Sequence, residues 1–396
     1  MAQSDTTKLT VQNALDKVVP PQVKKSHWYD KIQLRGYTQV RYNRLLETNP
    51  DLKFEGDRSV GDKGGAFIRR ARLIFFGDIS SHLFLYYQVD FASNASSTNM
   101  HFGQIRDLYA DIYVDTGKVF RFRVGQSKVP FGFENMQSSQ NRLALDRADA
   151  LNTAVPSERD LGAFFYWTPR KARYRYDYLG DKGLKGSNNY GVFGFGVYNG
   201  QSTNKPELNN SLHAVARLSY PFGFGKQILE IGIQGYTGFF TLESGQASSG
   251  VKKNSTSTYR DKRAAFSIAL APQPFGLLAE YNVGESPMYD VNRDSIVTAP
   301  LEGGFVTAFY MIKLKKVNQT LIPYVRAQYY TGGVKIATDA KALKMNEYDF
   351  GIEYQIMKSL EITASYVYSL RHTSDKAKEF YNQDCRLLRI QVQFNY

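Results

Sequence analysis

The sequence of 396 residues has no long apolar run, a single cysteine and only five histidines. A membrane-spanning helix needs about 18 to 20 consecutive apolar residues, so a helical membrane protein is excluded. The lone Cys385 cannot form an internal disulfide bond. The histidines lack metal-ligand spacing, and no Gly-x-Ser-x-Gly motif occurs. We therefore expect no enzymatic activity, no metal site and no cofactor.

The charge is strongly positive, with 50 Lys and Arg against 37 Asp and Glu and a formal net charge of +13. A basic chain raises the question of a nucleic-acid partner. Here the basic residues are spread from one end of the chain to the other. No basic helix, zinc-finger spacing or RNA-binding motif gathers them into one patch. We expect no nucleic-acid partner.

Aromatic residues and strict alternation are what the sequence has in plenty. Aromatics make up 14% of the chain, with 28 Tyr and 26 Phe. Near the end of the chain Ile390, Val392 and Phe394 fall on one face of a strand, and Arg389 and Gln391 fall on the other. The mean hydropathy is nevertheless −0.41. This combination predicts an all-β, antiparallel transmembrane barrel, with apolar residues toward lipid and polar residues toward the lumen.

About sixteen strands are predicted in a single barrel that spans residues 28–396. They lie near residues 32–42, 67–77, 83–92, 105–114, 119–126, 161–167, 190–198, 212–220, 227–240, 262–270, 275–284, 304–313, 320–331, 346–356, 360–370 and 384–396. Short turns alternate with long loops, which predicts short periplasmic turns and long extracellular loops. A barrel of sixteen strands is wide enough to enclose an aqueous channel.

Residues 1–27 do not alternate and are predicted to form a periplasmic N-terminal leader. No apolar signal segment opens the chain. Because a barrel must be exported, we expect a signal peptide that this numbering does not include, and the outer membrane of a Gram-negative bacterium as the location.

The inward face of the predicted barrel is rich in arginine, which binds anionic oxygens through its charge and its planar donors. The candidate pore-lining and anion-binding residues are Arg35, Arg70, Arg72, Arg121, Arg123, Lys128, Arg142, Arg147 and Arg326. The placement of Arg70 and Arg72 inward, rather than Arg69, would be reversed by a one-residue bulge. Inward acids such as Asp90 and Asp111 leave an alternative open, in which the arginines are paired and structural.

A constriction loop is predicted near residues 127–160, the longest connection in the chain. Long loops in compact proteins are usually functional. Arg142, Leu145, Asp146 and Asp149 have one-turn spacing, which predicts a short helix. Such a segment could fold into the pore and bring Lys128, Arg142 and Arg147 next to a passing solute. An exposed surface loop is the alternative.

Two stretches resemble the phosphate-selective porin O and P family. They are FIRRARLIFFGDISSHLFLYYQVDFA (residues 67–92) and DLYADIYVDTGKVFRFRVGQSKVPFGFENMQSS (residues 107–139), and the similarity extends from Trp28 to Tyr396. The resemblance implies a sixteen-stranded homotrimer in outer-membrane lipid and lipopolysaccharide, with an arginine-lined eyelet that prefers anions such as phosphate. The VGQSKVPFG form is more similar to relatives from Bacteroidetes, whose substrate can differ.

The function predicted from these observations is passive diffusion of small hydrophilic solutes, with a preference for anions. A structural barrel that serves as a subunit of a larger envelope complex is the main alternative. A soluble β-sandwich is disfavoured because its strands would need a second apolar layer.

Overall fold

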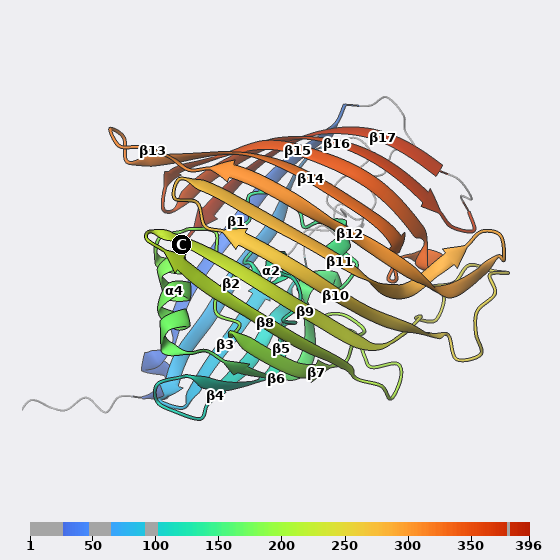
Figure 1. Cartoon of the computed structure of the whole chain (residues 1–396), viewed down its shortest axis with the longest axis horizontal. Helices are drawn as coiled ribbons and strands as arrows, with labels where there is room; N and C mark the ends of the chain where they lie inside the picture. Colours follow the sequence, from blue (N-terminus) through green and yellow to red (C-terminus); the bar gives the residue numbers. More distant parts are fainter. Residues whose placement is uncertain (1–26, 47–64, 92–101, 378–380) are drawn as a thin grey trace, which may run out of the picture.

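The strands of the computed structural model close into one antiparallel barrel (Figure 1). The structure describes residues 27–46, 65–91, 102–377 and 381–396, so the predicted leader lies almost entirely outside the described residues. Closure occurs where the first strand pairs with both the second and the last. At this seam the backbone groups of Gly36 and Tyr396 exchange hydrogen bonds of 2.6 and 3.0 Å. A Cβ at Gly36 would lie 2.3 Å from the Tyr396 ring, so only glycine fits there.

The first half of the wall contains β1 (Gln33–Leu45), β2 (Gly65–Ser80), β3 (Leu83–Asp90), β4 (Gln104–Tyr113), β5 (Phe120–Lys128), β6 (Arg159–Trp167), β7 (Phe193–Tyr198) and β8 (His213–Phe224). The second half contains β9 (Gln227–Thr241), β10 (Thr258–Leu270), β11 (Phe275–Asp290), β12 (Ser295–Tyr310), β13 (Ile312–Leu314), β14 (Gln319–Gly333), β15 (Ala342–Met357), β16 (Leu360–Ser374) and β17 (Tyr381–Asn395). The helical segments are η1 (Trp28–Lys31), α2 (Phe133–Met136), α3 (Asp149–Asn152), η2 (Pro156–Glu158), α4 (Arg170–Asp181) and η3 (Thr338–Ala340).

These seventeen strands make a barrel of sixteen strands, because β12 and β13 are two pieces of one barrel strand and both pair with β14. The predicted barrel and its strand number are therefore confirmed. Among the residues that the structure describes, no helix is both long enough and apolar enough to span a membrane.

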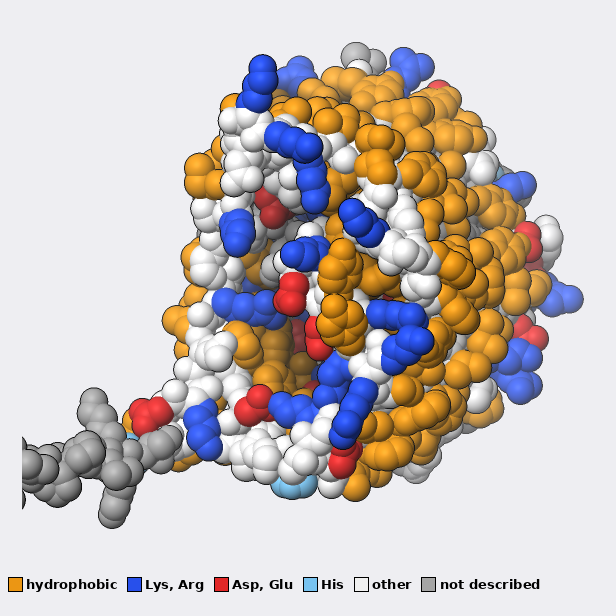
Figure 2. All heavy atoms as spheres, turned by 60° about the vertical axis from the view of Figure 1, so that its left-hand side comes forward, with side chains coloured by type: hydrophobic (Ala, Val, Ile, Leu, Met, Phe, Trp, Pro, Cys, Tyr) orange, Lys and Arg blue, Asp and Glu red, His pale blue; other side chains and the backbone are white. Residues whose placement is uncertain are grey.

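The two faces of the wall differ as the alternation predicts. Large apolar side chains such as Phe122, Ile233 and Phe350 are 46%, 56% and 53% exposed on the outside, and Figure 2 shows the orange surface that such side chains form. Inside, Arg41 and Glu353 are 0% and 1% exposed. Only a lipid solvent makes an apolar exterior and a charged interior stable together.

Two connections depart from the expected rhythm of short turns and long loops. At the end of the barrel that carries the short turns, here called the short-turn end, β6 and β7 are joined by residues 168–192, which contain the helix α4. At the opposite end, residues 291–294 join β11 to β12, because both strands extend past the bounds expected from the sequence. Their pairing continues from Gly284–Leu301 to Asp290–Ser295 and leaves only a tight connection there.

Candidate functional site

The segment between β5 and β6, residues 129–158, lies inside the barrel and is here called the inner loop. Val129, Phe131, Met136 and Leu151 have 0% exposure, although they belong to no strand. The ring of Phe131 packs edge-on against Tyr236 of β9, with the ring centres 4.9 Å apart. Apolar side chains can face inward here because they pack against each other and the wall instead of facing water.

Charged residues of distant strands hold the inner loop across the lumen. Arg326 of β14 binds both carboxylate oxygens of Glu134 at 2.6 and 3.1 Å. The Glu280 carboxylate of β11 accepts hydrogen bonds from the backbone N–H groups of Phe133 and Glu134 at 2.6 and 2.7 Å. Arg371 of β16 binds Asp149 at 2.6 Å. The loop leaves the wall at β5 and is therefore fixed to the other side of the barrel.

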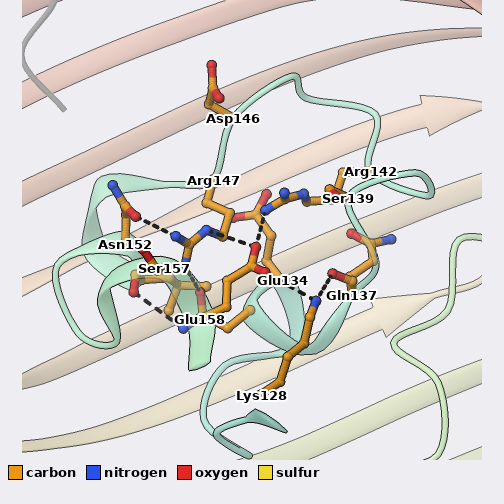
Figure 3. Close-up of polar contacts among 12 residues, drawn as sticks. Lys128, Glu134, Gln137, Ser139, Arg142, Asp146, Arg147, Asn152, Ser157 and Glu158 are labelled. Atoms are coloured by element: carbon orange, nitrogen blue, oxygen red, sulfur yellow. Dashed lines mark hydrogen bonds and ion pairs between the residues drawn. The ribbon is translucent and has the colours of Figure 1, made fainter. Parts of the chain in front are cut away.

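Glu158 of the inner loop is the centre of a cluster of charged contacts with the loop and with the two strands that it joins (Figure 3). Its carboxylate lies 3.0 Å from Arg142, 3.2 Å from Arg147, 3.4 Å from Lys128 and 2.5 Å from Arg159. Burial by itself would raise the pKa of the Glu158 carboxyl, but these cations more than offset burial and hold the pKa well below its usual range. One carboxylate thus organises four cations.

The short helix predicted around Arg142 to Asp149 is wrong. Residues 142–148 contain no helix, and the helical turn α3 begins at Asp149. The side chain of Arg142 turns toward Glu158, whereas Asp146 points away from that cluster (Figure 3). Asp146 binds Arg389 and Arg41 of the wall at 2.7 and 3.0 Å. Ion pairs in opposite directions determine this backbone, and they override the one-turn spacing.

A cavity of about 600 Å³ lies between the inner loop, the wall and the long loops. Among the residues that the structure describes, ten cationic and seven carboxylate side chains line it. The cations are Arg69, Arg70, Arg72, Arg106, Arg142, Arg147, Lys205, Arg326, Arg371 and Arg389, and the acids are Asp90, Asp146, Asp149, Glu158, Glu243, Glu347 and Asp349. The cavity wall therefore carries an excess of positive charge when all these groups are ionised.

The structure distributes the predicted site residues between paired and unpaired positions. Several have a carboxylate within 4 Å, as the alternative interpretation expects: Arg72 with Asp90, Arg121 and Arg123 with Asp111, Lys128, Arg142 and Arg147 with Glu158, and Arg326 with Glu134. Arg35 lies away from the cavity, stacked at 5.1 Å over the ring of Phe76. Arg70 lines the cavity and donates to the Gln39 side chain at 2.8 Å, with no carboxylate within 4 Å among the described residues.

Two cavity arginines that alternation does not place inward are Arg69 and Arg106. Each is the extra residue of a β-bulge, because the pairing steps from Arg70 to Ile68 in β2 and from Asp107 to Ile105 in β4. A bulge interrupts the period of two and redirects a side chain that would otherwise face lipid. Arg69 then approaches Asp146 at 3.4 Å, and Arg106 donates to the Ser157 carbonyl at 3.0 Å.

A closed barrel with a lipid-compatible exterior and a charged lumen, into which one long loop folds, defines an outer-membrane porin. The model of the phosphate-selective porin O and P family matches residues 48–396. The chain belongs to this family. It is a channel for the passive diffusion of small hydrophilic solutes across the outer membrane.

Solved structures agree with this assignment at the level of the fold. The outer-membrane channel DcaP of Acinetobacter baumannii matches at 16% identity and a TM-score of 0.55, with 92% of this chain and 97% of that chain covered. OmpF of Salmonella typhi, in a complex with daunomycin, matches at 12% identity and a TM-score of 0.56, with 92% and 97% covered. The trimer form of OmpT of Vibrio cholerae matches at 10% identity and a TM-score of 0.52, with 92% and 99% covered. A comparison with curated protein sequences found no match.

Proposed function

We propose that the channel prefers small anions, phosphate among them, and that the inner loop is its constriction. The observation that carries the proposal is the charge of the cavity, which ten cations and seven carboxylates of the described chain line. A confined lumen with an excess of one sign raises the local concentration of the opposite ion. Small inorganic anions fit a cavity of about 600 Å³.

Arg70 and Arg106 are the groups that we propose to meet the anion. Neither has a carboxylate within 4 Å among the described residues, and each has one hydrogen bond to a neutral oxygen. A guanidinium group has five N–H donors, so donors remain for the oxygens of a solute. The Nε of Arg106 is buried and has no partner within the part of the chain that the structure describes.

The carboxylates of the cavity favour a general anion channel over a strict phosphate filter. Glu347 and Asp349 lie on β15 beside Arg371 and Arg326, and they would repel a multivalent anion more strongly than a univalent one. We therefore propose that chloride, carboxylates and phosphate all pass. Addition of phosphate is expected to reduce chloride conductance only weakly.

Reversal potentials in planar bilayers test the preference directly. With a gradient of KCl across the membrane, the sign of the reversal potential must correspond to chloride being more permeant than potassium. A reversal potential of the opposite sign would refute the anion preference and leave the porin assignment intact.

We also propose a homotrimer in the outer membrane of a Gram-negative bacterium, with lipid and lipopolysaccharide around it. The wall from β3 to β7 has the shortest complete barrel strands. Its outer face carries Phe120, Phe122 and Phe195, which are 41%, 46% and 49% exposed. The solved OmpT structure is described as a trimer form. Sedimentation in detergent is expected to give the mass of three chains, and substitution of Phe122 by Arg should reduce it to that of one.

A further inference from the structure

The connection between β6 and β7, residues 168–192, is here called the periplasmic insert, because the short-turn end of such barrels faces the periplasm. Neighbouring connections at this end are short, with residues 225–226 between β8 and β9 and residues 271–274 between β10 and β11. The insert instead contains α4, which stands across this end of the barrel (Figure 1). Figure 2 shows the hollowed mouth there, with Lys and Arg side chains around it.

Hydrogen bonds to three places on the rim hold α4 across the mouth. Arg173 donates to the carbonyl of Gly117 at 2.5 Å, and Arg175 donates to the carbonyl of Pro221 at 2.5 Å. The hydroxyl of Tyr178 donates to Gln273 at 3.2 Å. These partners belong to the connections or strand ends around β5, β8 and β11, so the helix is attached to a wide arc of the rim.

After α4 the chain turns back into the lumen. Gly183 has a φ of +63°, a conformation that favours glycine, and it precedes Leu184 and Lys185, which are 4% and 8% exposed. The ammonium group of Lys185 binds both oxygens of Glu353 at 2.6 and 2.9 Å. Glu353 belongs to β15, and six barrel strands lie between β7 and β15 along the wall. The ion pair therefore ties the insert to the far side of the barrel.

The insert also contacts the inner loop. The side-chain amide of Gln137 donates to the carbonyl of Lys185 at 2.7 Å, and Lys128 donates to the carbonyl of Gln137 at 2.6 Å. From the wall, Arg121 donates to the carbonyl of Asn189 at 2.8 Å. The insert and the inner loop are therefore in direct contact inside the barrel.

We infer that the periplasmic insert forms a second constriction in series with the inner loop, and that the Lys185–Glu353 ion pair holds the insert in place. The inference deepens the proposed function, because it assigns a size limit to the same pathway. The pair is buried on both sides, at 6% and 2% side-chain exposure. Removing one partner of such a pair leaves a buried charge without compensation. Replacement of either residue therefore releases the insert from β15.

Single-channel conductance and swelling of proteoliposomes in neutral sugars of increasing size test the inference. Lys185→Met and Glu353→Gln are expected to raise conductance about twofold, because one of two resistances in series is lost, and to admit larger sugars. The double exchange Lys185→Glu with Glu353→Lys should restore the wild-type size limit. Lys182→Met is the matched control, because Lys182 is exposed and has no carboxylate within 4 Å among the described residues.

A deletion of residues 170–188 closed by glycine and serine provides the second variant, and it should exceed the point variants in conductance. The inference is overturned if the deletion, inserted as a folded channel, leaves the sugar size limit and the conductance unchanged. Neutral sugars carry no charge, so this result is independent of the reversal potentials. The sugar experiment therefore tests the second constriction whether or not the channel prefers anions.

Discussion

Replacement of Arg106 by glutamine tests whether unpaired arginines set the ion preference. Glutamine keeps a hydrogen-bond donor for the Ser157 carbonyl, which accepts from Arg106 at 3.0 Å, and removes the charge. A sphere of the cavity's volume, about 600 Å³, has a radius of about 5 Å. An ion about 5 Å from one lining charge interacts with it by about 0.8 kcal/mol at the dielectric constant of water, and more in a confined lumen.

The loss acts on both ion signs, because an anion loses an attraction and a cation loses a repulsion of the same size. The difference of about 1.6 kcal/mol lowers the anion-over-cation permeability ratio by roughly tenfold or more. Arg70→Gln should give a similar reduction. Screening shrinks the effect as salt rises, since the Debye length falls to about 3 Å at 1 M.

Reversal potentials at low salt provide the measurement, with Lys316→Gln as the control. Lys316 is exposed in the turn between β13 and β14, far from the cavity. The hairpin of these strands projects from the barrel rim (Figure 1). If Arg106→Gln, Arg70→Gln and the control all kept the wild-type permeability ratio, the reasoning from unpaired charge would be refuted.

Three further predictions concern the paired charges. Glu158→Gln leaves its four neighbouring cations without their shared carboxylate, and should lower the free energy of unfolding by about 3–5 kcal/mol, measured by denaturant titration of the folded band in electrophoresis. Burial raises the pKa of the Asp149 carboxyl, with Arg371 opposing the shift. Because this carboxyl takes up its proton as the pH falls through the raised pKa, the cavity becomes more positive. Anion preference should therefore rise on acidification, and rise less in Asp149→Asn. Arg326→Met removes the partner of Glu134 and should loosen the inner loop, seen as larger and noisier single-channel currents; unchanged currents would contradict that role.

The alternation of apolar and polar residues predicted the barrel because each strand has lipid on one side and a polar lumen on the other. The closing strand illustrates this, since Arg389 and Gln391 face inward at 3% and 6% exposure while Ile390 is 40% exposed. The same alternation could not place Arg69 and Arg106. A bulge shifts the register by one residue, and the adjacent polar pairs Arg69-Arg70 and Arg106-Asp107 mark such a break without showing where the second side chain of each pair points.

The pairing of the charged residues and the periplasmic insert were not predicted from the sequence, for different reasons. Whether Arg72 is free or paired depends on the register, which sets Asp90 directly opposite it in β3. The helix α4 did carry a signal, because its buried residues Ala172, Tyr176 and Leu179 have the spacing of one helical face. That face packs onto the barrel, and the cation-rich remainder of the segment obscured the pattern.

The division between paired and unpaired charges explains how one lumen can be both rigid and selective. An ion pair such as Arg326–Glu134 has nearly no net field at a distance, but it fixes the inner loop to the wall. A group such as Arg70, which has no carboxylate partner within the described part of the chain, contributes little to rigidity and its full charge to the potential. Substitutions at paired sites should therefore change conductance and stability first, whereas those at unpaired sites should change the permeability ratio first. This arrangement of paired and unpaired charges allows the ion preference to vary among relatives without a change of fold.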